Sequence, residues 1–150
     1  MLDVVIDDQP FRDVVAQISR RVGDLTPVLA EIGMELESRV SGRFETRTDP
    51  DGNPWAAWSQ STIDTYPEGG NRRLLDRLGD MLEGLSHQVN SGDSSVSIGF
   101  DRDYSTYHEW GTETMPRRGL LTSDPDAGTL SEDDTELVLD VLNDFLNNLA

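Results

Sequence analysis

The chain of 150 residues contains no cysteine, which excludes disulfides, thiolate metal sites and a cysteine nucleophile. It also contains no lysine, so all 12 of its basic residues are arginine. No apolar run approaches the roughly 18 residues that a membrane span needs, and no basic residue lies between Met1 and Pro10. We therefore predict neither contact with a membrane nor a signal peptide, and we expect the protein to be made in a cytoplasm.

Acidic side chains dominate the charge, since 29 of them give the chain a net charge of −17. Proteins bind nucleic acid through many cationic contacts to phosphates, so specific nucleic-acid binding is not expected. Residues 121–150 hold eight of the acids and no arginine. Three interpretations stay open for the acidic segment Asp124–Asp144: it lines a DNA path and repels the duplex, it faces a basic partner, or it only aids solubility.

The two histidines give little support for catalysis. His87 and His108 are 21 residues apart, and the chain has no H-x-x-x-H, G-x-S-x-G, Walker or G-x-G-x-x-G motif. Residues 49–53 begin like a calcium loop, but Pro54 and Gln60 stand where such a loop requires Gly and Glu. We interpret this segment as a tight turn, and we predict no enzyme activity, no cofactor and no metal site.

The spacing of apolar residues predicts an α+β protein with one domain, residues 1–150. We expect N-terminal helices, a small antiparallel β-sheet or hairpin, and a C-terminal helix. The first helix is predicted over residues 10–22, and the second runs from Thr26, as its N-cap, to about Phe44. Residues 59–64 are predicted to form one short capped helical turn.

The second half of the chain begins with a leucine-rich stretch, residues 71–85, whose spacing predicts a helix that a glycine interrupts. A sheet centred on residues 86–100 is expected next, because apolar and polar residues alternate around a turn. Tyr104, Tyr107 and Trp110 form a short aromatic segment that runs to Gly111. Residues 108–111 are interpreted as a turn that ends an extended arm. Ser131 is predicted to cap the final helix, with Asp134 and other acids favouring the helix dipole in its first turns.

Three blocks of residues, in this order, resemble one known family. Residues 42–55 read GRFETRTDPDGNPW, and residues 74–86 read LLDRLGDMLEGLS. The third block reads VSIG at 96–99, YHEWGT at 107–112 and MPRR at 115–118. Together they are similar to the phage virion morphogenesis family, also called tail completion. The resemblance spans about residues 10–149.

One departure lies just after the third block, where Gly119 and Leu120 stand in place of the usual Pro and Phe. The resemblance implies a structural, non-enzymatic phage protein that completes the tail and joins it to the head at the neck. The implied partners are further copies of the chain in an oligomeric ring, the tail tube or terminator proteins, and the head connector proteins. DNA would pass through the ring without specific binding. The implied location is the head–tail junction of the virion, after synthesis in the host bacterial cytoplasm.

Aromatic and arginine side chains in these blocks are candidates for the interfaces of such an assembly, because interfaces favour large amphipathic side chains and planar guanidinium groups. The alternative is that the tryptophans fill the core. The candidate interface residues are Trp55, Trp58, Tyr107, His108, Trp110, Arg117 and Arg118.

Three other functions stay open. The first is another phage structural role, as a tail terminator, a connector or a capsid-assembly subunit. The second is a small acidic protein that mimics DNA or binds a basic partner. The third is a metal-dependent enzyme, for which His108 would be the residue to test.

Overall fold

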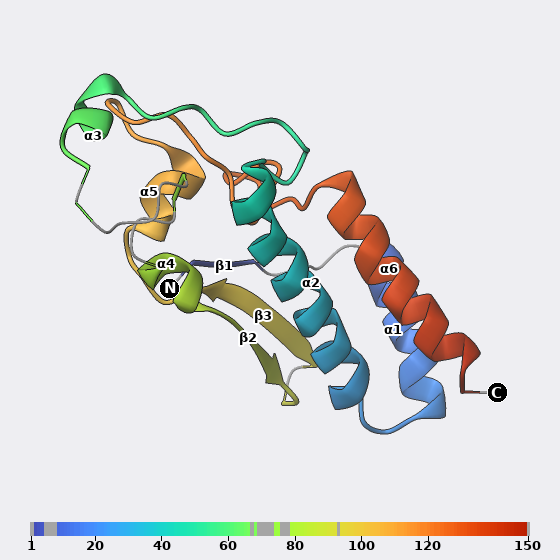
Figure 1. The fold of residues 1–150 in the computed structure, drawn as a ribbon. Coiled ribbons are helices and arrows are strands. Elements are labelled where there is room, and N and C mark those ends of the chain that lie inside the picture. Colours follow the sequence, from blue (N-terminus) through green and yellow to red (C-terminus); the bar gives the residue numbers. More distant parts are fainter. Residues whose placement is uncertain are drawn as a thin grey trace.

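The computed structural model describes residues 2–4, 9–66, 68, 74–75, 79–92 and 94–149, and it shows an α+β fold (Figure 1). As predicted, helices lie toward both ends of the chain and a small antiparallel sheet lies in its middle. In chain order the elements are β1 (Leu2–Val4), α1 (Gln9–Arg21), α2 (Thr26–Thr46), α3 (Gln60–Asp64), α4 (Asp80–Glu83), β2 (Leu85–Asn90), β3 (Ser95–Phe100), α5 (Ser105–Trp110) and α6 (Glu132–Asn147).

The two predicted N-terminal helices are confirmed, with one correction at a helix start. Pro10 lies in the first turn of α1, where its missing N–H leaves no hydrogen bond unmade. The prediction that Thr26 is the N-cap of α2 is wrong, because Thr26 is already the first helical residue. Leu25 occupies the cap position without a side-chain cap hydrogen bond. The N–H of Thr26 donates instead to Asp24 Oδ1 at 3.0 Å.

Two predicted side-chain caps are confirmed. Ser59 precedes the five-residue helix α3 and accepts a hydrogen bond from the N–H of Thr62. Ser131 precedes α6 and accepts from the N–H of Asp134 at 3.2 Å. In both places the serine has extended backbone angles, which direct its hydroxyl toward the free N–H groups of the first turn.

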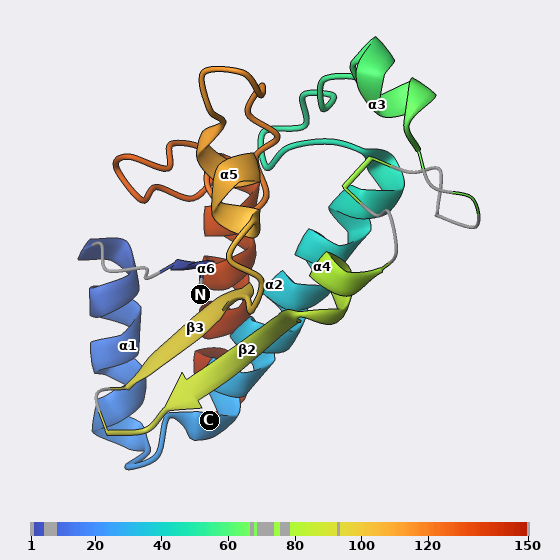
Figure 2. The same cartoon turned by 90° about the vertical axis from the view of Figure 1, so that its left-hand side faces the viewer.

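The sheet has the strand order β1-β3-β2, and both neighbouring pairs are antiparallel (Figure 2). β2 and β3 form the predicted hairpin, with Leu85 opposite Phe100 and Val89 opposite Val96. β1 adds to the other edge of β3, with Leu2 opposite Phe100. The sequence did not predict β1, because three residues are too few to establish an alternating pattern.

Helix α2 packs against β2 and β3 (Figures 1 and 2). Gly33 marks a close approach, because a Cβ atom there would lie only 2.4 Å from Cδ2 of His87 on β2. One turn further along α2, Oε2 of Glu37 lies 2.5 Å from Nδ1 of His87. His87 therefore has a structural position between the helix and the sheet.

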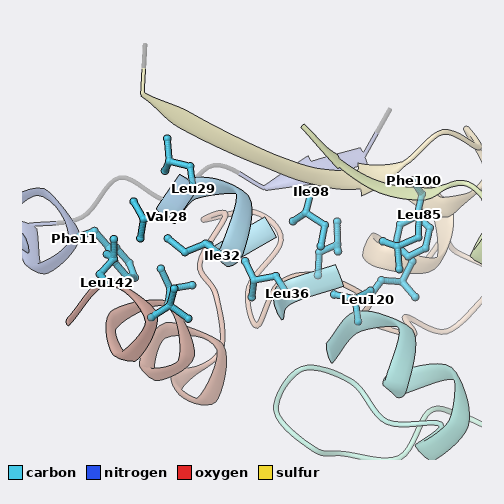
Figure 3. Packing of buried hydrophobic residues seen from close by; sticks show 14 of the residues in the cluster. Phe11, Val28, Leu29, Ile32, Leu36, Leu85, Ile98, Phe100, Leu120 and Leu142 are labelled. Carbon is cyan, nitrogen blue, oxygen red and sulfur yellow. The ribbon is translucent and has the colours of Figure 1, made fainter. Parts of the chain in front are cut away.

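The apolar core runs through the molecule from α1 and α6 to the sheet. α6 packs against both α1 and α2. Figure 3 shows Phe11 of α1 beside Leu142 of α6, so residues near the two ends of the chain meet in the core. Farther along the same core, Leu120 lies close to Leu85 and Phe100. Leu120 comes from a long segment without regular secondary structure, and that segment positions the candidate site.

The predicted helix over residues 71–85 falls largely outside the described residues. Where the structure describes this stretch, residues 74–75 form a turn and helix α4 begins only after Gly79. Gly79 has a φ of 85°, which glycine adopts without strain. Leu85 is in strand β2 and not in a helix. Gly79 therefore precedes a short helix and does not interrupt a long one.

The prediction of an extended arm that ends in a turn at residues 108–111 is wrong. Residues 105–110 form helix α5, and Tyr104, Tyr107 and Trp110 are spaced by three residues, which suits a helical turn. The predicted change of direction at Gly111 is present, with a φ of 75°. A Cβ atom at Gly111 would lie 2.9 Å from the backbone nitrogen of Arg117, so the chain passes close to itself here.

Candidate interaction site

The turn at residues 49–54 leads the chain from α2 into the candidate site. Oδ1 of Asp49 accepts from the N–H groups of Asp51 at 3.0 Å and Asn53 at 2.8 Å, which is the tight turn that the sequence predicted. The Ser123 hydroxyl donates to Oδ2 of Asp51 at 2.8 Å. This turn is thereby joined to the segment that follows residue 122.

Residues 117–122 form an irregular segment, here called the strap, and the carboxylate of Glu109 holds it from inside. Glu109 is completely buried. Its Oε2 accepts from the N–H groups of Leu120 at 2.6 Å and Leu121 at 3.0 Å, and its Oε1 accepts from the N–H and hydroxyl of Thr122. The Arg117 guanidinium lies 3.3 Å from Oε1 and also donates to the Glu109 carbonyl. These donors compensate for the burial of a charge.

A buried ion pair fixes the strap to the helices. The Arg43 guanidinium on α2 donates to the Leu120 carbonyl at 2.7 Å and pairs with the Asp134 carboxylate on α6. Arg43 and Asp134 have only 6% and 2% of their side chains exposed. Arg39, one turn earlier on α2, donates to the Asp133 carbonyl at 2.9 Å. One arginine thus connects α2, α6 and the strap.

Two further side chains fix the strap to residues 55–57. Nε1 of Trp55 donates to the Gly119 carbonyl at 2.9 Å. In the other direction, the Arg118 guanidinium donates to the carbonyls of Ala56 at 2.8 Å and Ala57 at 2.9 Å. These bonds position the chain on either side of a cleft, although neither segment has regular secondary structure.

The cleft has a volume of about 580 Å³ and is bounded by α3, α4, α5 and the residues before the strap. Trp58 and Tyr66 stack at one wall, with ring centroids 4.7 Å apart. Met81 of α4 is buried against it, and His108 and Arg118 supply the polar part of the lining. The cleft combines an apolar surface with a few polar groups, as binding sites commonly do.

His108 is uncharged at neutral pH. Burial, and secondly the nearby charge of Arg118, lower the pKa of His108 to about 4. Its Nδ1 is buried and has no hydrogen-bond partner among the residues that the structure describes. Burial likewise lowers the pKa of Arg118.

Exposed apolar side chains concentrate beside this cleft. Of the five large hydrophobic residues that are exposed in the described parts of the chain, Met34 lies on α2, and the other four lie on α3 or in the region of α5. In both Figure 1 and Figure 2, α3 and α5 lie at the end of the molecule away from the C-terminus. We call residues 54–66 and 104–122 the aromatic end. Its four exposed large residues are Ile63, Tyr104, Tyr107 and Trp110.

The aromatic end is nearly neutral, unlike the rest of the protein. Residues 54–66 contain one charged residue, and residues 104–122 contain two acids and two arginines, which together give a net charge of −1. Residues 123–150 contain eight acids and no arginine. The other segments therefore carry a net charge of −16, and one of their acids, Asp126, accepts a hydrogen bond from Trp110.

The candidate interface residues lie together at the aromatic end, but their exposure differs. Tyr107 and Trp110 are 58% and 43% exposed, and Nε1 of Trp110 donates to Asp126 at 3.0 Å. Trp58 and His108 are half-buried in the cleft wall. Trp55 is buried, which supports the alternative that it fills the core. The two arginines, Arg117 and Arg118, hold backbone carbonyls inside the molecule.

Sequence reasoning missed Glu109, Arg43 and Asp134 as the residues that hold the site. Glu109 belongs to no periodic pattern of apolar residues, so the sequence gives no sign that its side chain is buried. Asp134 is where the sequence predicted a favourable charge at a helix N-terminus, and its burial against Arg43 is a different role. Asp134 is therefore one acid of Asp124–Asp144 that cannot face a DNA path.

The model of the phage virion morphogenesis family matches residues 6–147. The chain belongs to this family. No curated protein and no solved structure gives a significant match. The match covers the helices of the core, the strap and the aromatic end, and membership of the family indicates a structural role in phage virion morphogenesis for the chain.

Two other observations concern chemistry and location. Within the described residues, no three His, Asp or Glu side chains are grouped so that they could hold a metal ion. None of the helices described is both long and apolar enough to cross a membrane.

Proposed function

We propose that this phage virion morphogenesis protein completes the tail and joins it to the head at the neck, as a ring of identical subunits. The aromatic end is the observation that supports this role most directly. It exposes Tyr104, Tyr107 and Trp110 on one short helix and its flank, beside a cleft, and it has almost no net charge. The centres of protein interfaces are enriched in Tyr and Trp and depleted of charge.

The interior of the aromatic end favours a docking surface over a catalytic site. The buried carboxylate of Glu109 is fully used by backbone N–H groups, a hydroxyl and a guanidinium. Arg118 is used by two carbonyls. These groups make the surface rigid, and a rigid surface loses little entropy when it binds a partner. The proposed work is recognition of neighbouring subunits and of tail and connector proteins, with no covalent chemistry.

Electron microscopy of phage that lack this protein tests the proposal. We expect lysates that contain filled heads and complete-length tails but few joined, infectious particles. Joined virions at normal titre would contradict the role. Lysates without heads would place the protein in capsid assembly, and tails of irregular length would place it in tail termination.

A further inference from the structure

Strand β2 is an edge of the sheet whose outer side is unpaired in the described parts of the chain. The strand order β1-β3-β2 places it on the outside, and Figure 2 shows it there. Its backbone pairs with β3 on one side, and no other described segment forms a backbone hydrogen bond with it. An edge of this kind offers a row of N–H and C=O groups with which a further strand can pair.

The β2 edge also lacks the features by which proteins prevent such pairing. Edges are commonly protected by charged side chains, by proline, by a bulge or by being very short. β2 contains no acid, no arginine and no proline, and its six residues pair with β3 in an unbroken register. The opposite edge, β1, has only three residues, and one of them is Asp3. β2 is therefore the edge at which a further strand is expected.

The absence of charge on β2 indicates which strand can pair with it. Two copies that each carry −17 repel one another wherever acidic surfaces meet. The side chains that β2 exposes are those of Ser86, Gln88 and Asn90, and all three are uncharged. Antiparallel pairing of β2 with β2 of a second copy therefore satisfies both edges and places no acids opposite each other in the two strands.

A groove beside this edge fits the same partner. It has a volume of about 320 Å³ and lies between α2 and the start of β2. Its one charged residue, Glu37, is already bonded to His87, and Met34 is 58% exposed. Because α2 packs over β2, a sheet that continues through two β2 strands brings two α2 helices side by side, where flexible Met34 side chains can fill the space between them. The groove is lined by Met34, Glu37, Ser38, Ser41, Leu82 and Leu85.

We propose that the free protein is a two-fold dimer in which the β2 strands of two copies pair antiparallel and join the two sheets. Such a contact is isologous, because both copies use the same surface. Opposite residues of an antiparallel pair point to the same face, and burial alternates along β2. With Gln88 opposite Gln88 of the second copy, Ser86 lies opposite Asn90, and both α2 helices lie on one face of the joined sheet. This dimer concerns the protein before it joins the virion, and it uses no residue of the aromatic end.

Introduced cysteines test the pairing, because the natural chain has none. In a Gln88→Cys dimer the two thiols lie opposite each other, and oxidation with diamide should join them in a disulfide. We expect a shift on a non-reducing gel from 16.7 kDa to twice that mass. Gln17→Cys changes an exposed glutamine of α1 in the same way and should stay at the monomer mass.

The register is tested with two further cysteine variants. A mixture of Ser86→Cys and Asn90→Cys should give covalent dimers, because each position lies opposite the other in the paired strands. Either variant alone should not, and covalent dimers from Ser86→Cys alone would overturn this register.

A charge at the centre of the contact tests the dimer without cross-linking. Gln88→Glu places two carboxylates opposite each other, and like charges directly opposite destabilise strand pairing. Light scattering after size-exclusion chromatography should give twice the monomer mass for the wild type and for Gln17→Glu, and the monomer mass for Gln88→Glu. Because Gln88 is exposed, the monomer keeps its fold, which circular dichroism checks.

Three results would overturn the dimer. The first is a wild-type protein that is monomeric at all concentrations, and the second is equal cross-linking of Gln88→Cys and Gln17→Cys. The third is an oligomer that Gln88→Glu does not weaken, which would show that the copies meet through another surface. The neck role does not depend on these results, because the microscopy of phage lacking the protein tests it separately.

Discussion

In the body of the protein, formed by α1, α2, α6 and the sheet, apolar side chains from elements far apart in the sequence fill one continuous core. The aromatic end is held in another way, because side chains there bind the backbone of segments that have little regular structure. Glu109, Arg118 and Trp55 each hold carbonyl or N–H groups of another segment. Buried polar groups of this kind are costly when one partner is lost. The body therefore depends on packing, and the aromatic end depends on a small number of specific hydrogen bonds.

The largest expected loss of stability comes from a change to the ion pair that connects the body to the strap. Asp134→Ala leaves the buried Arg43 guanidinium without its carboxylate, and removing one partner of a buried ion pair costs about 3–5 kcal/mol. Urea unfolding measures this loss. Asp140→Ala removes an exposed acid of the same helix and should change the free energy of unfolding by less than about 0.5 kcal/mol. Equal losses in the two variants would show that burial of the pair is unimportant.

Within the aromatic end, Glu109→Gln tests how much the hydrogen bonds between the Glu109 carboxylate and the strap stabilise the protein. The change keeps the size of the side chain but removes its charge and turns an NH2 group toward N–H donors. Hydrogen bonds to a charged group contribute about 1.5–3 kcal/mol, and we expect a loss of stability in that range. The exposed Glu113→Gln is the control. A Glu109→Gln protein as stable as the control would mean that the carboxylate does not fix the strap.

His108 adds a pH dependence that originates in the aromatic end. The pKa of its side chain is 6.5 when free and about 4 in the folded protein. Between these pH values the unfolded chain binds a proton that the folded chain does not, so the free energy of unfolding decreases as the pH falls from 6.5 to 4 and this contribution is constant below 4. With allowance for partial exposure, we expect about 2 kcal/mol.

Comparison with His108→Phe isolates this contribution from the many carboxylates. The variant keeps a ring but has no titrating group, so its stability should fall less steeply than that of the wild type between pH 6.5 and 4. Parallel curves would contradict the lowered pKa of His108.

The smallest expected effect on stability comes from removing the serine N-cap of one helix in each region. Ser131→Ala removes the cap of α6, a helix packed in the core, and should cost about 1 kcal/mol in urea unfolding. Ser59→Ala removes the cap of α3, a five-residue helix with no buried residue, so its loss should be seen in local hydrogen exchange and hardly in global stability. If Ser59→Ala lowers global stability as much as Ser131→Ala, α3 is part of the core.

The sequence predicts the body better than the aromatic end for the same physical reason. Periodic apolar residues reveal a helix such as α6 or a hairpin such as β2 and β3, because burial repeats along the element. The strap has no period, and the side chains that hold it, Arg43 and Glu109, are 66 residues apart in the chain. The sequence predicts Arg117 and Arg118 as interface residues because arginine is common at interfaces. Their hydrogen bonds are instead internal, to carbonyls that the fold brings close to them, and no local sequence pattern predicts which carbonyls these are.

A complementation experiment separates folding from assembly in a phage. Phage that lack the protein are supplied with it from a plasmid, as the wild type, as Ala16→Glu or as Tyr107→Glu, and the titre of joined particles is measured. Because Tyr107 is exposed, we expect purified Tyr107→Glu to be as stable as the wild type and yet to restore few infectious particles. Ala16→Glu, which adds the same charge on the exposed side of α1, should restore the full titre. Full titre with Tyr107→Glu would contradict the assignment of the aromatic end as the assembly surface.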